Sequence, residues 1–144
     1  MSYLSYRIAL YKLHRKRQKK GEVISKYVEE ARRTGGETKA QEVYESERFD
    51  LDMIDHEIQY LQTRYLINKA RKNFLDVPPF SEESDLWEHS PFTRKYQLTE
   101  KGITQIRNTI RGYEKERREK VAFYVNILFG LLGLLIGLIA VIKR

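Results

Sequence analysis

An uncharged apolar stretch, residues 121–142, constrains the fold more than any other feature of this chain. A helix rises about 1.5 Å per residue, so this stretch reaches roughly 33 Å and is long enough to cross a bilayer core of about 30 Å. The rest of the chain is hydrophilic, because 33% of all residues are charged and the mean hydropathy is -0.62. A helix of a small soluble protein is rarely apolar on every face, so we predict one transmembrane helix. The alternative is a hydrophobic helix used only for oligomerisation.

The distribution of basic residues around this stretch predicts its orientation. The side of a span that is richer in Lys and Arg stays in the cytoplasm. Basic residues before the stretch outnumber those after it: Arg107, Arg111, Lys115, Arg117, Arg118 and Lys120 precede it, and Lys143 and Arg144 follow it. We therefore expect residues 1–120 in the cytoplasm, in a tail-anchored arrangement. The absence of cysteine fits a reducing compartment.

Residues 1–75 predict a helical hairpin and, with the rest of the chain, an all-α fold. One helix is expected over residues 3–33 and another from Thr38 to about Leu75, because the glycines at 35 and 36 favour a helix end between them. Two long helices joined by a short turn fold back antiparallel. A coiled-coil seam with 3-4-3-4 spacing runs along the second helix: Leu51, Ile54, Ile58, Leu61 and Tyr65. The first helix offers a matching frame: Tyr6, Leu10, Leu13, Ile24, Tyr27 and Ala31.

The remainder divides into a linker, a juxtamembrane helix and the anchor. Residues 76–98 read as a short acidic and aromatic linker, in which Phe80, Trp87 and Phe92 are expected to pack back on the hairpin and residues 94–98 favour a short strand. Thr99 is the expected N-cap of a long C-terminal helix, which covers residues 99–120 and continues into the anchor at 121–142.

A basic block at residues 12–20 has an acidic counterpart in the same hairpin. With the turn near residue 36, position i faces roughly position 71 minus i, which sets the block opposite Asp52, Asp55 and Glu57. Each exposed ion pair adds only about 0.2–1 kcal/mol, but the pattern helps to specify the register. Two further interpretations stay open, namely contact with an anionic membrane surface and nucleic-acid binding through phosphate contacts.

Small and polar residues define one face of the span. They recur every three or four positions: Asn126, Gly130, Gly133, Gly137 and Ala140. In lipid, close backbone approach and interhelical hydrogen bonds drive helix association, and glycines permit that approach. We therefore predict self-association through this face. The alternative is a chance stripe, because glycine is common in membrane helices.

The juxtamembrane basic residues form a second candidate site. Five of them are assigned to anionic lipid headgroups: Arg111, Lys115, Arg117, Arg118 and Lys120. Basic residues beside a span attract such headgroups at about 1 kcal/mol each. Glutamates between these basic residues reduce the net positive charge. The alternative is therefore that the basic residues only determine the topology and lie on a solvated helix.

The sequence carries no pattern typical of catalysis. The three histidines, His14, His56 and His89, are dispersed and have no metal-binding spacing, and there is no glycine-rich phosphate loop. We therefore expect no enzyme, no cofactor and no metal.

The C-terminal half resembles a known group of proteins. Tyr-Gln-Leu-Thr-Glu-Lys-Gly at residues 96–102 is followed by Ile-Arg at 106 and 110, and Lys-Glu-Arg-Arg-Glu at 115–119 then leads into the glycine-rich span. Over residues 87–142 this resembles a module of small, poorly characterised bacterial single-pass membrane proteins. The resemblance implies a bacterial source, hence the inner membrane, and no particular activity. Residues 96–102 alone are similar to the strand-to-helix step of winged-helix domains, but the long hairpin departs from their compact three-helix pattern.

Together these features predict an assembly protein at the membrane. Its span and hairpin would self-associate and offer a scaffold or a platform for another helical protein. One alternative is an oligomeric pore-forming or membrane-disrupting effector, of the kind used as toxins or in phage defence, with the face from Asn126 to Ala140 lining the lesion. A second alternative is a membrane-tethered DNA-binding regulator, although nucleic acid is the least expected partner.

Overall fold

The structure is a computed structural model that describes residues 1–81 and 83–142; for residues 137–142 it describes the helical backbone only. The elements are α1 (Tyr3–Lys72), β1 (Trp87–His89), β2 (Tyr96–Leu98) and α2 (Glu100–Ile142). The chain is therefore mostly helical, as predicted. It divides into two compact units, Met1–Ile106 and Arg107–Arg144, which are described separately below.

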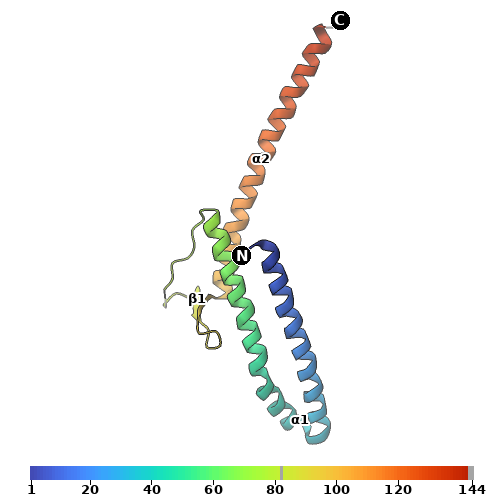
Figure 1. Cartoon of the computed structure of the whole chain (residues 1–144), viewed down its shortest axis with the longest axis vertical. Coiled ribbons are helices and arrows are strands. Elements are labelled where there is room, and N and C mark those ends of the chain that lie inside the picture. The colour runs from blue at the N-terminus through green and yellow to red at the C-terminus, as the bar shows by residue number, and fades with distance from the viewer. Residues whose placement is uncertain (82, 143–144) are drawn as a thin grey trace. The chain divides into compact units, whose positions relative to one another are not determined.

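The helical hairpin predicted for the N-terminal part is present within α1 (Figure 1). Gly36 is its one non-helical position, with φ 75° and ψ -167°, and separates a first arm (residues 3–35) from a second arm (residues 37–72). This backbone region is open essentially to glycine alone, which explains why the turn falls there. Ser2 caps the first arm by accepting a hydrogen bond from the Ser5 amide at 3.2 Å. The second arm ends three residues before the predicted Leu75, because Phe74 adopts a left-handed φ of 55°.

The two arms pack through apolar and aromatic side chains. Ile54 and Ile58 of the predicted seam are buried, and Leu51, Leu61 and Tyr65 are half-buried. Tyr65 stacks on Tyr6 of the first arm, with ring centroids 3.9 Å apart and an interplanar angle of 7°. The frame predicted for the first arm is wrong at Tyr27, which is 50% exposed, because Val28 takes the inward position between Ile24 and Ala31. Coiled-coil geometry at this interface stays a prediction.

Ion pairs between the arms follow the predicted register. Position 17 was expected to face position 54, and the Arg17 guanidinium contacts Asp55 at 2.5 Å. Position 20 was expected to face position 51, and Lys20 Nζ lies 2.8 Å from both Asp50 and Glu47. Hydrogen bonds to Asp50 and then Glu47 raise the pKa of Lys20 above its usual range. Of the predicted acidic partners, Asp55 therefore engages the basic block, whereas Asp52 lies 3.4 Å from Arg48 of its own arm.

Replacing Gly36 with alanine is expected to destabilise the hairpin by about 1–3 kcal/mol, because a side chain strains this backbone conformation. Gly21 provides the matched control: it is helical, and a Cβ there meets nothing within 4 Å. Gly21→Ala is therefore expected to stabilise by about 0.5–1 kcal/mol. Thermal unfolding of the whole chain in detergent, followed by circular dichroism, measures both changes. Shifts of the same sign would contradict the assignment of the turn to Gly36.

A small sheet corrects the expectation of an all-α fold. β1 and β2 pair antiparallel, with Trp87 opposite Leu98, Glu88 opposite Gln97 and His89 opposite Tyr96. The sequence predicted a strand only over residues 94–98 and gave no partner for it. β1 was missed because three residues are too few to show the alternation by which strands are usually detected.

The sheet is attached to a second face of the second arm. Residues on this face recur every three or four positions: His56, Gln59, Thr63, Leu66 and Ala70. The Leu98 amide donates to Thr63 Oγ1 at 3.0 Å, and Gln59 Nε2 donates to the Leu98 carbonyl at 2.9 Å. Gln97 is fully buried; its Nε2 donates to Glu88 at 3.0 Å and lies 2.8 Å from His56 Nδ1. Side chains of α1 thus supply hydrogen bonds that a two-stranded sheet lacks.

The aromatic residues of the linker have specific partners. Phe92 packs on the second arm as predicted, with its ring centroid 5.1 Å from that of Phe49 and 4.8 Å from that of His56. Phe80 instead packs within the linker and sheet, 4.5 Å from the Tyr96 ring and 5.7 Å from the Trp87 ring. Through these contacts Phe80 packs the linker against both strands of the sheet.

The start of α2 explains the Leu-Thr-Glu-Lys-Gly motif. Thr99 caps the helix, and its Oγ1 accepts from the Gly102 amide at 3.3 Å and donates to the Asp85 carbonyl at 2.8 Å. A Cβ on Gly102 would lie 2.5 Å from the Leu86 carbonyl oxygen, so only glycine fits this close approach. Lys101 forms an ion pair with Asp85. The motif therefore fixes the first turn of α2 against the linker.

Candidate membrane anchor and assembly face

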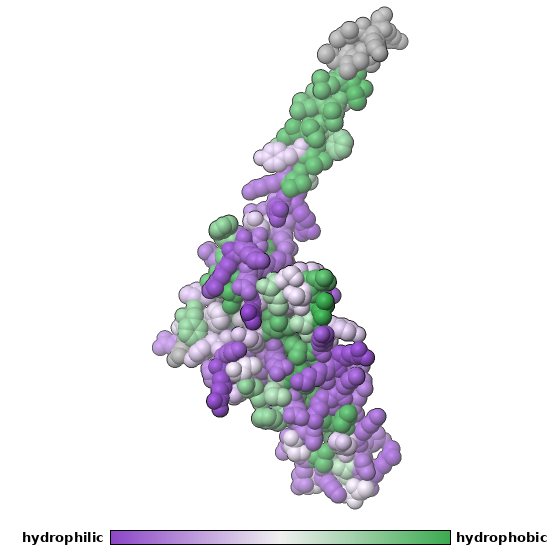
Figure 2. Space-filling model, in the orientation of Figure 1, coloured by the Kyte–Doolittle hydropathy of each residue, from purple (hydrophilic) through white to green (hydrophobic). Residues whose placement is uncertain are grey.

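The apolar residues of α2 are exposed on every side over residues 121–136, where their side chains are described. Among the described residues, one helix is long and apolar enough to cross a membrane; its most apolar window has a mean hydropathy of 1.7, and none of that window is buried. Leu134 is 73% exposed and Phe129 68%. Figure 2 shows hydrophobic surface along the visible side of this segment and hydrophilic surface before it. Soluble proteins rarely expose such a large contiguous apolar surface, so this segment requires a non-aqueous environment or a partner.

The predicted small-residue face is open where the structure describes it. Asn126 is exposed, and a Cβ added to Gly130 or Gly133 would meet nothing within 4 Å. These glycines are therefore not required by packing within the described part of the chain. Gly137 and Ala140, the other two predicted members, lie outside the residues whose side chains are described.

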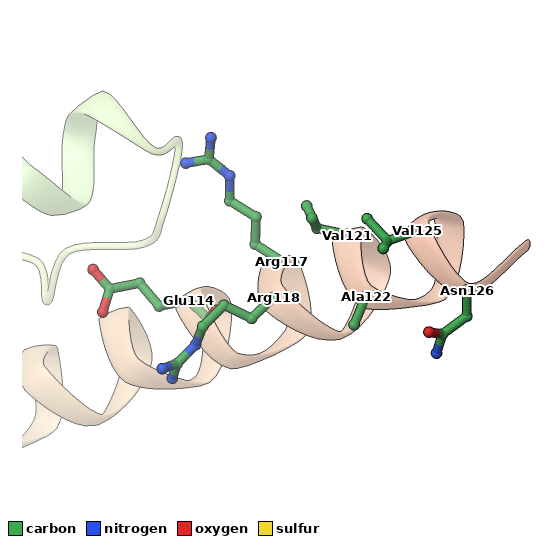
Figure 3. A pocket seen from close by; sticks show the side chains of 7 residues that line it. All are labelled: Glu114, Arg117, Arg118, Val121, Ala122, Val125 and Asn126. Atoms are coloured by element: carbon green, nitrogen blue, oxygen red, sulfur yellow. The ribbon is translucent and has the colours of Figure 1, made fainter. Parts of the chain in front are cut away.

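Ala122 extends this face and was missed by the sequence analysis. It lies four positions before Asn126, and Figure 3 shows the two side chains pointing to the same side of α2. The signal was available, because alanine continues the spacing of small residues by one turn. With Ala122 the candidate face begins at the start of the span.

An open groove marks the boundary between the charged and apolar parts of α2. It measures about 560 Å³, and both charged and apolar residues line it (Figure 3): Glu114, Arg117, Arg118, Val121, Ala122, Val125 and Asn126. Arg118 Nε donates to the Glu114 carbonyl at 3.2 Å, which holds this guanidinium along the helix. The groove therefore combines cationic side chains with apolar ones one turn further on.

The predicted headgroup residues are spread around α2. Arg117 and Arg118 line the groove, whereas Arg111, Lys115 and Lys120 are exposed outside it. Lys115 Nζ lies 3.9 Å from Glu119, one turn along the helix. The structure thus brings two of the five together, and their contact with lipid stays a prediction.

The titratable residues of the described chain do not gather into a metal-binding group. No cluster of three His, Cys, Asp or Glu side chains that could hold a metal ion occurs within residues 1–81 and 83–136. His56 takes part in the network around Gln97, and the His89 ring packs on Tyr96 with centroids 5.1 Å apart.

Comparison of the chain with protein-family models, with curated proteins and with solved structures gives no match. An uncharged exposed helix, a small-residue face and a cationic boundary are features suited to insertion and helix pairing.

Proposed function

We propose that this chain is a non-enzymatic single-pass membrane protein that self-associates through α2 and presents its helical hairpin as a scaffold or as a platform for a helical partner. The observation that carries the proposal is the exposure of the apolar side chains of α2 over residues 121–136, none of which is buried. A lipid bilayer removes this apolar surface from water. It can accept a helix because the backbone polar groups are already hydrogen-bonded within the helix.

Assembly within the membrane is supported by the face that includes Ala122, Asn126, Gly130 and Gly133. Small residues allow two backbones to approach closely, and an asparagine in a span adds an interhelical hydrogen bond worth about 0.6–2 kcal/mol. The basic residues before the span favour a cytoplasmic location for the hairpin. Together with the bacterial resemblance, this favours the bacterial inner membrane.

Flotation tests the anchoring. The whole chain, mixed with vesicles of neutral phosphatidylcholine during reconstitution, is expected to float with them and to resist extraction at alkaline pH. A variant with Leu128→Arg and Leu132→Arg is expected to lose both properties, since a charge at the centre of a span costs about 2.5–3.5 kcal/mol. Recovery of the unaltered chain in the soluble fraction would reject the proposal.

A membrane-disrupting effector is the second candidate. Asn126 favours it, because a polar side chain on an otherwise apolar span would face the centre of an assembly. Dye-loaded vesicles distinguish the candidates: leakage caused by the assembled chain supports the effector, whereas intact vesicles containing cross-linked assemblies support the scaffold.

A further inference from the structure

The open end of the helical hairpin, where the first arm begins and the second arm ends, exposes an apolar cluster. Its members are large side chains: Met1, Tyr3, Leu4, Ile8 and Tyr11. Leu4 is 69% exposed and Tyr11 65%. The two arms meet here, because the Tyr3 and Tyr65 rings lie 6.3 Å apart and Met1 lines a groove together with Asn73. The exposed cluster therefore belongs to the start of the first arm, at the end of the hairpin where the second arm finishes.

Basic side chains continue the first arm beyond this cluster. Four of them are exposed and line a shallow, open groove on the surface of the helix: Lys12, Arg15, Lys16 and Lys19. Their neighbours Arg17 and Lys20 point to the second arm and are engaged by its acids. Within the described part of the chain these four have no ion-pair partner, in contrast to Arg32 and Arg33 near the turn, which pair with Glu37 and Glu29.

The apolar and basic residues share one face of the first arm. Leu4, Ile8, Tyr11, Arg15 and Lys19 recur every three or four positions, on the side opposite the buried Tyr6 and Ile24. We call residues 4, 8, 11, 12, 15, 16 and 19 the outer face. Figure 2 shows hydrophobic surface at the open end of the first arm and hydrophilic surface further along it.

We propose that the outer face docks on an anionic lipid surface. Apolar side chains beside clustered lysine and arginine form the pattern by which helices lie in the membrane interface. The basic groove complements lipid phosphates and carboxylates, and each basic residue strengthens such binding roughly fivefold. Nucleic acid would complement the charges equally but would leave Leu4 and Ile8 in water. This inference rests on the proposed membrane location. In addition to the contact that α2 makes with the bilayer, it gives the hairpin a charge-dependent contact of its own.

A single fluorescent label tests the docking, because the chain contains no cysteine. The whole chain with Ile8→Cys carries a polarity-sensitive dye and is reconstituted into phosphatidylcholine vesicles with or without phosphatidylserine. The emission is expected to shift to the blue only in the anionic vesicles and to revert at high salt. The same dye at Thr38→Cys, beside the turn, is expected to show no shift.

Charge variants supply the matched control. Arg15→Gln with Lys19→Gln is expected to lower the ratio of docked to undocked hairpin roughly 25-fold. Arg32→Gln with Arg33→Gln removes the same charge near the turn and is expected to leave the emission unchanged. Identical emission at position 8 in neutral and anionic vesicles, or a change only after an oligonucleotide is added, would overturn the proposal. Flotation with neutral vesicles separates this result from a failure of anchoring, because docking is not needed for flotation.

Discussion

Replacing Gly130 and Gly133 together with leucine is expected to abolish disulfide cross-linking of the chain through Glu119→Cys in lipid vesicles. Glu119 is exposed and lies on the same side of α2 as the small-residue face, so two associated helices bring position 119 of each close together. Leucine side chains on both glycines hold the backbones apart and remove the close packing on which association in lipid depends. A single Asn126→Leu change is expected to weaken association by about 0.6–2 kcal/mol, because only the interhelical hydrogen bond is lost.

The control for this experiment lies on the opposite side of the span. Leu128→Ala with Leu135→Ala changes side-chain volume away from the small-residue face and is expected to leave the cross-linked fraction as it is. The glycine variant is also expected to float with vesicles, because a Cβ at either glycine meets nothing in the described chain. Cross-linking that persists in the glycine variant would place the assembly contact elsewhere and reject this face.

The sequence predicted the parts of the fold that depend on local patterns. The turn at Gly36, the apolar segment of α2 and the N-cap at Thr99 each follow from residue types that act within one or two turns of chain. The inter-arm register was also predicted, because the position of the turn alone decides that Arg17 meets Asp55. The inward residue between Ile24 and Ala31 does not follow from helical spacing, because Tyr27 and Val28 both fit it.

The sheet and its contacts with α1 depend on long-range interactions and were missed. β1 is stable beside β2 because Gln59 and Thr63, far away in the chain, bind the backbone of Leu98. The second face of the second arm mixes His56, Gln59 and Thr63 with apolar residues, so it reads as polar surface in the sequence. The candidate assembly face stays a prediction, and extending its small-residue spacing by one turn would have included Ala122.

Leu98→Ala is expected to destabilise the first unit by about 2–5 kcal/mol, the usual cost of a cavity left by a buried leucine. Leu98 is fully buried, and its side chain packs closely on the first turn of α2, where a Cβ on Gly102 would lie 2.9 Å from Leu98 Cδ2. Leu4→Ala is the matched control, because the same side chain is lost from a position that is 69% exposed; its effect is expected within about 0.5 kcal/mol. Urea unfolding of the whole chain in detergent measures both.

The hydrogen bonds of Leu98 distinguish a loss of packing from a loss of the sheet. Thr63→Val keeps the shape of the buried side chain but removes the acceptor of the Leu98 amide, and an unpaired buried amide costs about 1–3 kcal/mol. Hydrogen exchange at the Leu98 amide is therefore expected to accelerate in Thr63→Val. It is expected to accelerate in Leu98→Ala only as far as the overall loss of stability requires. Equal stability of Leu98→Ala and Leu4→Ala would show that the buried Leu98 side chain does not stabilise the first unit, and unchanged exchange at the Leu98 amide in Thr63→Val would show that the sheet is not anchored to α1 through this hydrogen bond.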